Sequence, residues 1–551
     1  IDRIWVGTDD GLIYTTADGG RHWTDVTPPA LVPWAKVSII DAGRFDALTA
    51  YAAVNTIRLD DMRPHIYRTH DGGKTWTEIV TGLPEGATVN AVREDPVRRG
   101  LLFAGTEREV CASFDDGANW QSLRLNMAAS SVRDLIVKDD DLVAATHGRG
   151  FWILDDITPL RQLDPAAVKA EATMFKPQTA VRVRWNMNTD TPLPPDEPGG
   201  ENPPDGAILD YALKSEAAGP VTLEVVNAEG KLVRRYSSED KPAEIPAAEA
   251  APLPLYWYRP PQALKATAGM HRFLWDMRWQ PLPGGGGRGG GLGMAAIAHN
   301  TAPTPNSIWA APGDYTMKLT VNGKTLSQPL TLKMDPRVKT PAADLARQTE
   351  LVESAYKGVL EAQAALQQVR AVRAQVKKLQ DKIRGAVPPG GNNPSSQASQ
   401  TTASASQTGA QAPAPSNPIG QPPSPLLQAL ADFDKKAADL EGGGGGPGGR
   451  GGAAMGGPPM GPPEGMGGPG FPGGGAGAAT LGGVSASLNQ LMNLLQAADA
   501  APTTQATAAT RDRLTTLRAL IGTWESLLTK DLPALNAALK AANLPPIEAG
   551  R

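Results

Sequence analysis

The octapeptide Thr69-His70-Asp71-Gly72-Gly73-Lys74-Thr75-Trp76 decides the fold of the N-terminal part of this chain, because its pattern occurs three times. The earlier copy is Thr16-Ala17-Asp18-Gly19-Gly20-Arg21-His22-Trp23, and the later copy is Ser113-Phe114-Asp115-Asp116-Gly117-Ala118-Asn119-Trp120. All three share a hydroxyl residue, any residue, Asp, any residue, Gly, two further residues and Trp. A pattern that returns in this way indicates a repeated structural unit.

The residue types of this pattern are those of a tight turn between two strands. Aspartate accepts hydrogen bonds from N–H groups of its own turn, and serine or threonine does so more weakly. Glycine adopts positive φ where the chain reverses, and we expect the tryptophan to return into the sheet and bury its ring. We therefore interpret the motif residues as structural rather than as ligand contacts; they are Thr16, Asp18, Gly20, Trp23, Thr69, Asp71, Gly73, Trp76, Ser113, Asp115, Gly117 and Trp120.

The spacing of the repeats predicts a β-propeller. The tryptophans at 23, 76 and 120 are 53 and 44 residues apart, and a four-stranded blade repeats every 40–50 residues or so. A fourth hairpin without the motif follows at 142–156, and His147 and Arg149 lie at its tip. These two residues are either an exposed tip or contacts for a ligand, and we keep both alternatives open.

The motifs predict a partial propeller over 1–163. Closed propellers usually have four to eight blades, and the sequence opens inside a predicted strand at Ile4-Trp5-Val6. We therefore expect this chain to be the C-terminal part of a longer protein whose further blades and signal peptide precede Ile1.

The three motifs, together with Thr146-His147-Gly148-Arg149-Gly150-Phe151-Trp152-Ile153-Leu154-Asp155-Asp156, resemble the sortilin/Vps10-like BNR (Asp-box) repeat propellers of bacterial type. The stretches 221–234, 269–278 and 312–319 further resemble the strands of a FlgD-like immunoglobulin-type domain. The resemblance implies an exported protein, extracellular or periplasmic. It does not imply one activity, because sialidases, plant-polymer glycosidases and non-enzymatic receptors all carry Asp boxes.

Residues 205–337 are predicted to form an immunoglobulin-like β-sandwich after a connecting segment at 164–204. Val221, Leu223 and Val225 alternate with polar residues, as in a half-buried strand. Asn322-Gly323 is a strong hairpin signal, and a Gly-rich insert at 284–293 should be a surface loop. His271 and Arg272 are expected on a strand, facing solvent.

The C-terminal region is predicted to be helical, so the fold class is mainly β with an α-helical C-terminal region. A long helix at 340–384, capped by Thr340, has apolar residues in two series spaced by seven, which favours packing on a partner helix. Residues 385–480 are low-complexity linker around a short helix at 425–440. Helices within 484–542 should pack back on 340–384 as a hairpin or bundle, with a kink at Pro533.

Composition excludes several classes of function. The net charge is −4, so no basic excess favours nucleic acid. No run of about 18 apolar residues predicts a transmembrane helix. The single cysteine, Cys111, forms no internal disulfide, and the six histidines show no metal-ligand spacing. No phosphate-cradling glycine motif is present, so we predict no cofactor and no metal.

Two hypotheses of function remain. The first is an exported, non-enzymatic binding or scaffold protein that recognises a protein, peptide or glycan; the oligomeric state is left open. The second is a glycoside hydrolase, sialidase-like or polysaccharide-cleaving, with a carboxylate pair in the propeller groove. A sialidase-like site would need an arginine cluster and a tyrosine nucleophile, yet Arg3, Arg68 and Arg149 are scattered along the chain.

Overall fold

The computed structural model of the 551-residue chain describes residues 2–184, 200, 203–241, 262–283, 307–385, 425–442 and 479–550. The predicted insert at 284–293 and most of the predicted linker at 385–480 lie outside these ranges. Two compact units are present. The first contains Ile1–Gln280 with Ala310–Arg337, and the second contains Val338–Arg551. None of the helices in the described ranges combines the length and hydropathy needed to cross a bilayer.

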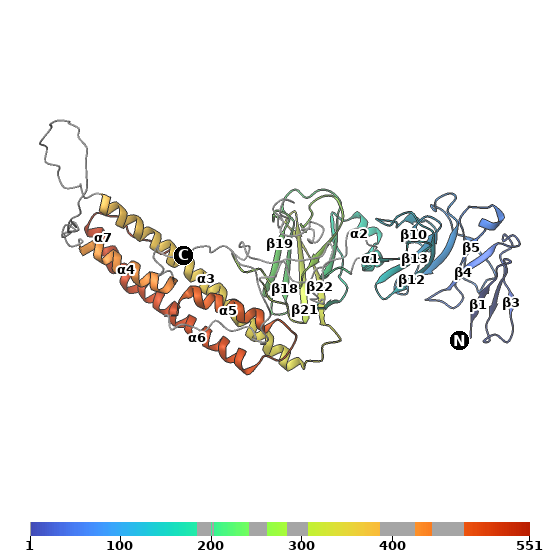
Figure 1. Ribbon diagram of the computed structural model, residues 1–551. Coiled ribbons are helices and arrows are strands. Elements are labelled where there is room, and N and C mark those ends of the chain that lie inside the picture. Colours follow the sequence, from blue (N-terminus) through green and yellow to red (C-terminus); the bar gives the residue numbers. More distant parts are fainter. Residues whose placement is uncertain are drawn as a thin grey trace, which may run out of the picture. The chain divides into compact units, whose positions relative to one another are not determined.

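Four antiparallel sheets follow one another in chain order at the start of the first unit (Figure 1). Within each sheet, every strand pairs with the next one along the sequence, which is a propeller-like arrangement. A short 3₁₀ turn, Ile57–Leu59, lies between two strands of the second sheet. The strands are β1 (Ile4–Gly7), β2 (Ile13–Thr16) and β3 (Thr24–Asp25); β4 (Lys36–Ala42), β5 (Ala50–Asn55), β6 (His65–Thr69) and β7 (Thr77–Glu78); β8 (Val89–Glu94), β9 (Leu102–Thr106), β10 (Val110–Ser113) and β11 (Gln121–Ser122); and β12 (Val132–Lys138), β13 (Asp141–Thr146) and β14 (Phe151–Leu154).

Successive sheets pack face to face through apolar side chains. Ile13 and Val54 belong to the core between the first and second sheets. Ile66 and Val92 belong to the core between the second and third sheets, and further apolar residues join the third sheet to the fourth. The second and third sheets are therefore apolar on both faces, as internal blades are.

Two further sheets complete the first unit. Their strand orders are β15-β17-β20 and β16-β22-β21-β18-β19, and all pairs are antiparallel except β16 with β22. The segment predicted as a connector supplies α2, β15 and β16, so it is part of these sheets. The elements are α1 (Thr158–Gln162), α2 (Pro165–Lys169), β15 (Ala172–Met174), β16 (Ala180–Arg182), β17 (Ala207–Leu213), β18 (Thr222–Asn227), β19 (Leu232–Ser237), β20 (Gly269–Trp275), β21 (Gly313–Val321) and β22 (Lys324–Met334).

The hairpin between β21 and β22 has the two-residue turn that the sequence predicts. Asn322 and Gly323 have φ of 48° and 77°, and two consecutive positive φ angles match the twist of a two-residue hairpin. The more specific assignment of these sheets to an immunoglobulin-type domain stays a prediction.

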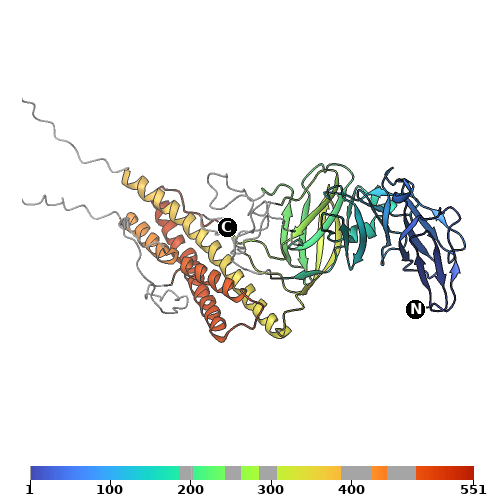
Figure 2. The same ribbon diagram turned by 45° about the vertical axis from the view of Figure 1, so that its right-hand side comes forward.

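The second unit is helical. Its elements are α3 (Ala342–Gly385), α4 (Pro425–Glu441), α5 (Leu481–Leu495), α6 (Thr504–Ser526), a π-helical turn (Leu527–Asp531) and α7 (Leu532–Ala541). Helix α3 lies beside α4, α5 and α6 in both ribbon views (Figures 1 and 2). The predicted heptad positions face these neighbours, since Val352, Val359, Val369 and Val376 are buried. The hydroxyl of Thr340, the predicted cap of α3, donates to the carbonyl of Asp499 at 2.6 Å.

Candidate functional site

The three repeated turns share one hydrogen-bond pattern. In the second turn the N–H of Gly73 donates to the Thr69 hydroxyl (2.9 Å), and the hydroxyl donates to Asp71 (2.9 Å). Asp71 also accepts the N–H of Thr75 at 2.9 Å, and this bond is the main reason that its pKa falls to about 2. Equivalent bonds join Thr16, Asp18, Gly20 and His22 in the first turn, and Ser113, Asp115, Gly117 and Asn119 in the third.

The second and third turns also attach their sheet to the preceding one. The indole N–H of Trp76 donates to the carbonyl of Val26 (2.7 Å), and that of Trp120 donates to the carbonyl of Ile79 (2.8 Å). A Cβ on Gly117 would lie 2.3 Å from Ile79 Cδ1, and Gly117 has φ of 86°. Glycine is therefore required here for backbone conformation and for close approach between sheets.

The expectation that all three tryptophans are buried is wrong for Trp23, and Trp76 is only half-buried. Trp120 is 5% exposed, whereas Trp23 is 43% exposed, and its indole N–H bonds to Gly20 in its own turn. The cause is the packing partner. Trp120 packs on the preceding sheet, and no earlier sheet lies beside Trp23 in the described part of the chain.

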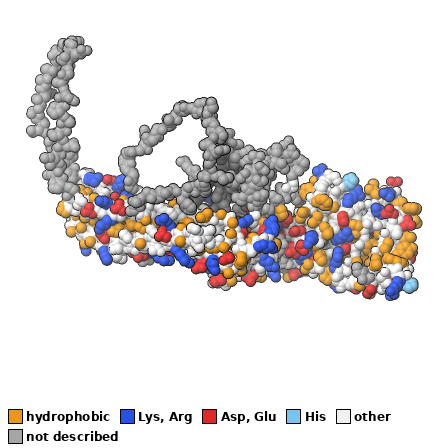
Figure 3. Space-filling view, turned by 60° about the horizontal axis from the view of Figure 1, so that its bottom comes forward, with side chains coloured by type: hydrophobic (Ala, Val, Ile, Leu, Met, Phe, Trp, Pro, Cys, Tyr) orange, Lys and Arg blue, Asp and Glu red, His pale blue; other side chains and the backbone are white. Residues whose placement is uncertain are grey.

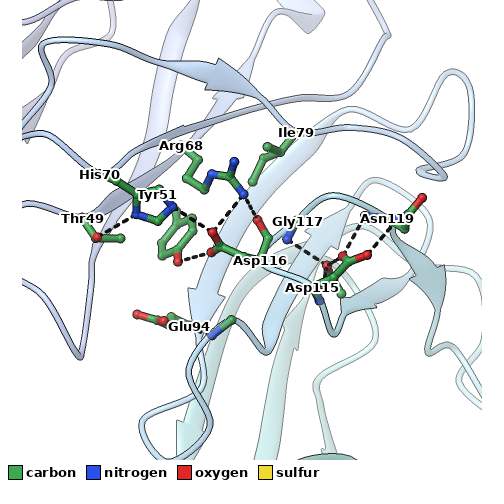
Figure 4. A network of polar contacts seen from close by, with 12 residues as sticks. Thr49, Tyr51, Arg68, His70, Ile79, Glu94, Asp115, Asp116, Gly117 and Asn119 are labelled. Carbon is green, nitrogen blue, oxygen red and sulfur yellow. Dashed lines mark hydrogen bonds and ion pairs between the residues drawn. The ribbon is translucent and has the colours of Figure 1, made fainter. Parts of the chain in front are cut away.

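A polar network forms where the third turn meets the second sheet (Figure 4). At its centre is Asp116, which follows the motif aspartate and has a left-handed backbone with φ of 61°. Its carboxylate accepts the Tyr51 hydroxyl at 2.6 Å, Arg68 Nη1 at 2.9 Å and His70 Nε2 at 2.8 Å. The other ring nitrogen of His70 lies 2.9 Å from the hydroxyl of Thr49. Two strands, β5 and β6, and two turns of neighbouring sheets thus meet at one carboxylate.

The hydrogen bonds that join Asp116, His70 and Thr49 follow the order of acid, histidine and hydroxyl in a hydrolase triad. The burial of the hydroxyl, however, indicates a structural role. The nucleophile of a triad must be reachable by substrate, whereas Thr49 is 5% exposed and its hydroxyl also lies 3.2 Å from Asp46 Oδ2. Of these three residues, His70 is the accessible one, because its side chain is 52% exposed. The network therefore holds two sheets together.

The same network contains the tyrosine and arginine that a sialidase-like site would use. Tyr51 is 1% exposed, and burial, followed by its hydrogen bond to Asp116, raises the pKa of its phenol well above the usual range. A neutral, buried phenol is a hydrogen-bond donor rather than a nucleophile. Arg68 is likewise bonded to Asp116, so its guanidinium is engaged in the contact between the two sheets.

Two carboxylates at the ends of the first strands of the second and third sheets are also buried. Asp41 and Glu94 are 5% and 3% exposed. The N–H of Glu94 donates to Asp41 at 2.8 Å, and the N–H of Arg44 donates to Glu94 at 2.8 Å. Burial raises the pKa of Asp41. Asp41 and Glu94 accept hydrogen bonds from main-chain N–H groups. Their burial does not favour a role as the catalytic carboxylate pair of a glycoside hydrolase, which must reach substrate in an open groove.

The predicted tip of the fourth sheet is exposed. His147, Gly148, Arg149 and Gly150 are all exposed, and Phe151, the first residue of β14, is 78% exposed. In the second and third sheets the motif lies in the turn between the third and fourth strands. The tip of the fourth sheet is the turn between its second and third strands, and consecutive hairpin turns lie at opposite ends of a sheet.

An apolar strip continues from this tip across the fourth sheet. Ile136, Val143 and Ile153 are aligned in register across its three strands, and Ile136 and Ile153 are 55% and 56% exposed. Figure 3 shows hydrophobic side chains among charged ones at the surface of the N-terminal sheets. We call Ile136, Phe151 and Ile153 the apolar strip of the fourth sheet.

Arg272 has a structural role that the sequence did not indicate. Arg272 lies on β20 and is exposed, as predicted, but its side chain also pairs with buried Asp210 at 3.0 Å and donates to the carbonyls of Asp155 and Asp156. It thus ties β20 to the chain that leaves the fourth sheet. Among the described residues, no group of three or more His, Cys, Asp or Glu side chains could hold a metal ion.

No protein-family model and no curated protein matches the sequence. Solved structures that are similar include YCF48 bound to a D1 peptide, at 18% identity over 28% of this chain and 46% of that chain, with a TM-score of 0.23. The GH74 xyloglucanase from Xanthomonas campestris matches at 17% identity over 39% and 32%, with a TM-score of 0.24. The chain thus spans less than half the length of either. These TM-scores are too low to support an argument about the fold. The propeller-like description therefore rests on the strand order and packing of the four sheets.

Proposed function

We propose that this chain is an exported, non-enzymatic binding or scaffold protein of the Asp-box propeller kind, with an immunoglobulin-type domain after the propeller. Its ligand is a protein, peptide or glycan. The recognition surface is the tip of the fourth sheet, formed by His147, Arg149 and Phe151.

One observation carries this proposal: three exposed side chains suited to recognition, His147, Arg149 and Phe151, lie within five residues of one another at this tip. Arg149 offers several hydrogen-bond donors in a fixed geometry, His147 offers a ring that can donate or accept, and Phe151 is 78% exposed beside them. Arginine and aromatic side chains are the types that most often anchor binding interfaces. Asp41, Glu94 and Tyr51 of the neighbouring sheets are buried in contacts between strands, where a substrate does not reach them.

Arrayed peptides and glycans, probed with the fluorescently labelled full chain, test this function. We expect one ligand class to bind, and Arg149→Ala and Phe151→Ser each to weaken that binding by about tenfold, as for an interface hot spot worth over 1 kcal/mol. The matched control is Arg124→Ala, an exposed arginine on the neighbouring sheet, which should leave binding unchanged.

Two results would count against the proposal. Hydrolysis of any substrate in a panel of polysaccharides and sialosides would show an enzyme and revive the glycosidase hypothesis. Binding that is equally strong in the Arg149 and Phe151 variants would place the recognition surface elsewhere.

A further inference from the structure

A cleft of about 450 Å³ lies between α3 and α5 in the helical unit. Helix α3 contributes Val359, Gln363, Leu366, Gln367 and Arg370, whose spacing places them on one face of the helix, and Pro283 completes that side of the lining. Helix α5 contributes a second stripe with the same kind of spacing, consisting of Gly482, Ser485, Ala486 and Asn489.

Small residues open the cleft. Gly482, Ser485 and Ala486 fill little of the space opposite α3, so the two helices leave a gap there. The contrast lies on the adjacent part of α3, where a Cβ on Gly358 would come within 2.9 Å of Leu488 and 2.8 Å of Leu514. Tight packing beside an open segment makes this a local, shaped cavity.

Two hydrogen-bond acceptors in the lining residues are unused. Gln363 Oε1 and Asn489 Oδ1 are both buried and accept no hydrogen bond from the described residues. A buried acceptor left unpaired destabilises the fold, because it has lost its bond to water without gaining another. An apolar residue at either position would avoid that cost, so the two amides are better explained by a bound group that donates to them.

The charges around the cleft select the kind of ligand. Arg370 at its margin is already paired with Glu441 at 2.8 Å, and no carboxylate lines the cleft in the described part of the chain. A cation would therefore find no counter-charge, and an anion would find no unpaired cation among the described lining residues. The cleft therefore favours a neutral ligand with N–H or O–H donors for the two unpaired oxygens.

The apolar walls refine this choice. Val359, Leu366 and Ala486 are aliphatic, and no aromatic ring lines the cleft among the described residues, so the stacking surface that sugars favour is missing. A peptide segment offers what remains, namely main-chain N–H donors flanked by small apolar side chains. We propose that the cleft between α3 and α5 binds a short, uncharged peptide segment through Gln363 and Asn489.

Saturation-transfer NMR on the full chain with acetyl-Ala-Leu-Ala-N-methylamide tests this proposal. We expect saturation of the peptide signals, and about fivefold weaker binding for Gln363→Leu and for Asn489→Leu, the loss expected for one hydrogen bond near 1 kcal/mol. The matched control is Gln490→Leu, next to Asn489 but outside the cleft lining; it should bind like the wild type.

A control peptide tests the other side of the same hydrogen bonds, because it lacks the main-chain N–H donors while the protein keeps its acceptors. The same peptide with its backbone nitrogens methylated should bind at least fivefold more weakly to the wild-type chain. Thermal melts should show both leucine variants as stable as the wild type or more so, because each removes an unpaired acceptor. Ala486→Leu, which fills the cleft, should also abolish the signal.

Three results would overturn the proposal. The first is an absence of saturation transfer to the wild-type chain, and the second is unchanged binding in the double variant of Gln363 and Asn489. The third is saturation transfer to methyl glucoside, a neutral sugar, under conditions in which the peptide shows no saturation transfer. The cleft and the tip of the fourth sheet share no residue, so either proposal can fail without the other.

Discussion

Asp116→Asn should loosen the contact between the second and third sheets by roughly 2 kcal/mol. A hydrogen bond to a charged group contributes about 1.5–3 kcal/mol, and the dominant one here is the 2.6 Å bond from Tyr51, which is 1% exposed. The contributions of Arg68 and His70 are smaller, because both side chains reach solvent and exposed ion pairs are worth about 0–1 kcal/mol. Asparagine tolerates the left-handed backbone of residue 116, so the change isolates the carboxylate.

Amide hydrogen exchange followed by mass spectrometry measures this effect locally, which matters in a chain with two compact units. Peptides covering β5, β6 and the third turn should exchange faster by the factor that 2 kcal/mol implies, about 30-fold. Tyr51→Phe should give a similar change, and the double variant should be clearly less than additive, since one substitution removes the charge of the acceptor and the other removes the donor of the same bond.

Asp139→Asn is the matched control. Asp139 also has a left-handed backbone, with φ of 55°, but its side chain is 81% exposed beside Lys138. Exposed substitutions usually change stability by less than about 0.5 kcal/mol. We expect Asp139→Asn to leave the exchange rates of β5 and β6 unchanged. If Asp116→Asn also left them unchanged, the network would not hold the sheets together.

Three further predictions concern the same sheets. Cys111, 0% exposed and with its pKa raised to about 12 by burial, should react with a thiol reagent only after unfolding; rapid labelling of the native chain would contradict its place in the core. Asp71 has a lowered pKa, so its stabilising contribution should be complete above about pH 4 and decline towards pH 2; Asp71→Asn should flatten the acid side of the stability profile, and an equally steep profile would refute this. Phe151→Ser combined with Ile153→Thr should reduce self-association in sedimentation velocity without lowering the melting temperature; unchanged association would show that the apolar strip is not adhesive.

Features set by neighbours in sequence could be predicted. The turn residues act within eight positions of one another, and the hairpin at Asn322-Gly323 depends on two consecutive residues. The heptad spacing in α3 placed Val359 and Val369 on the buried face. In each case the residues that make the feature lie close together in the chain, so their types and spacing determine it.

Features that depend on distant partners could not be predicted. Tyr51 and Asp116 are 65 positions apart, and nothing in either residue's surroundings marks the bond between them. The strands β15 and β16 are three residues long, too short for an alternating pattern, and they form by pairing with β17 and β22. The cleft between α3 and α5 likewise needs the register of two helices that are far apart in sequence.

The exposed Trp23 and the apolar strip of the fourth sheet follow from the same repeated interface. Each of the second and third turns places a tryptophan against the preceding sheet, and each of those sheets carries apolar residues on the face that receives the next. Trp23 occupies the same motif position in the first turn, and the apolar strip lies on the fourth sheet, yet both are exposed in the described structure. Both places therefore resemble the two surfaces that pack together between successive sheets, and neither is covered by another sheet among the described residues. This explains why the sheets over 1–160, isolated from the rest of the chain, should be poorly soluble; a monodisperse, cooperatively melting monomer of that segment would contradict this explanation.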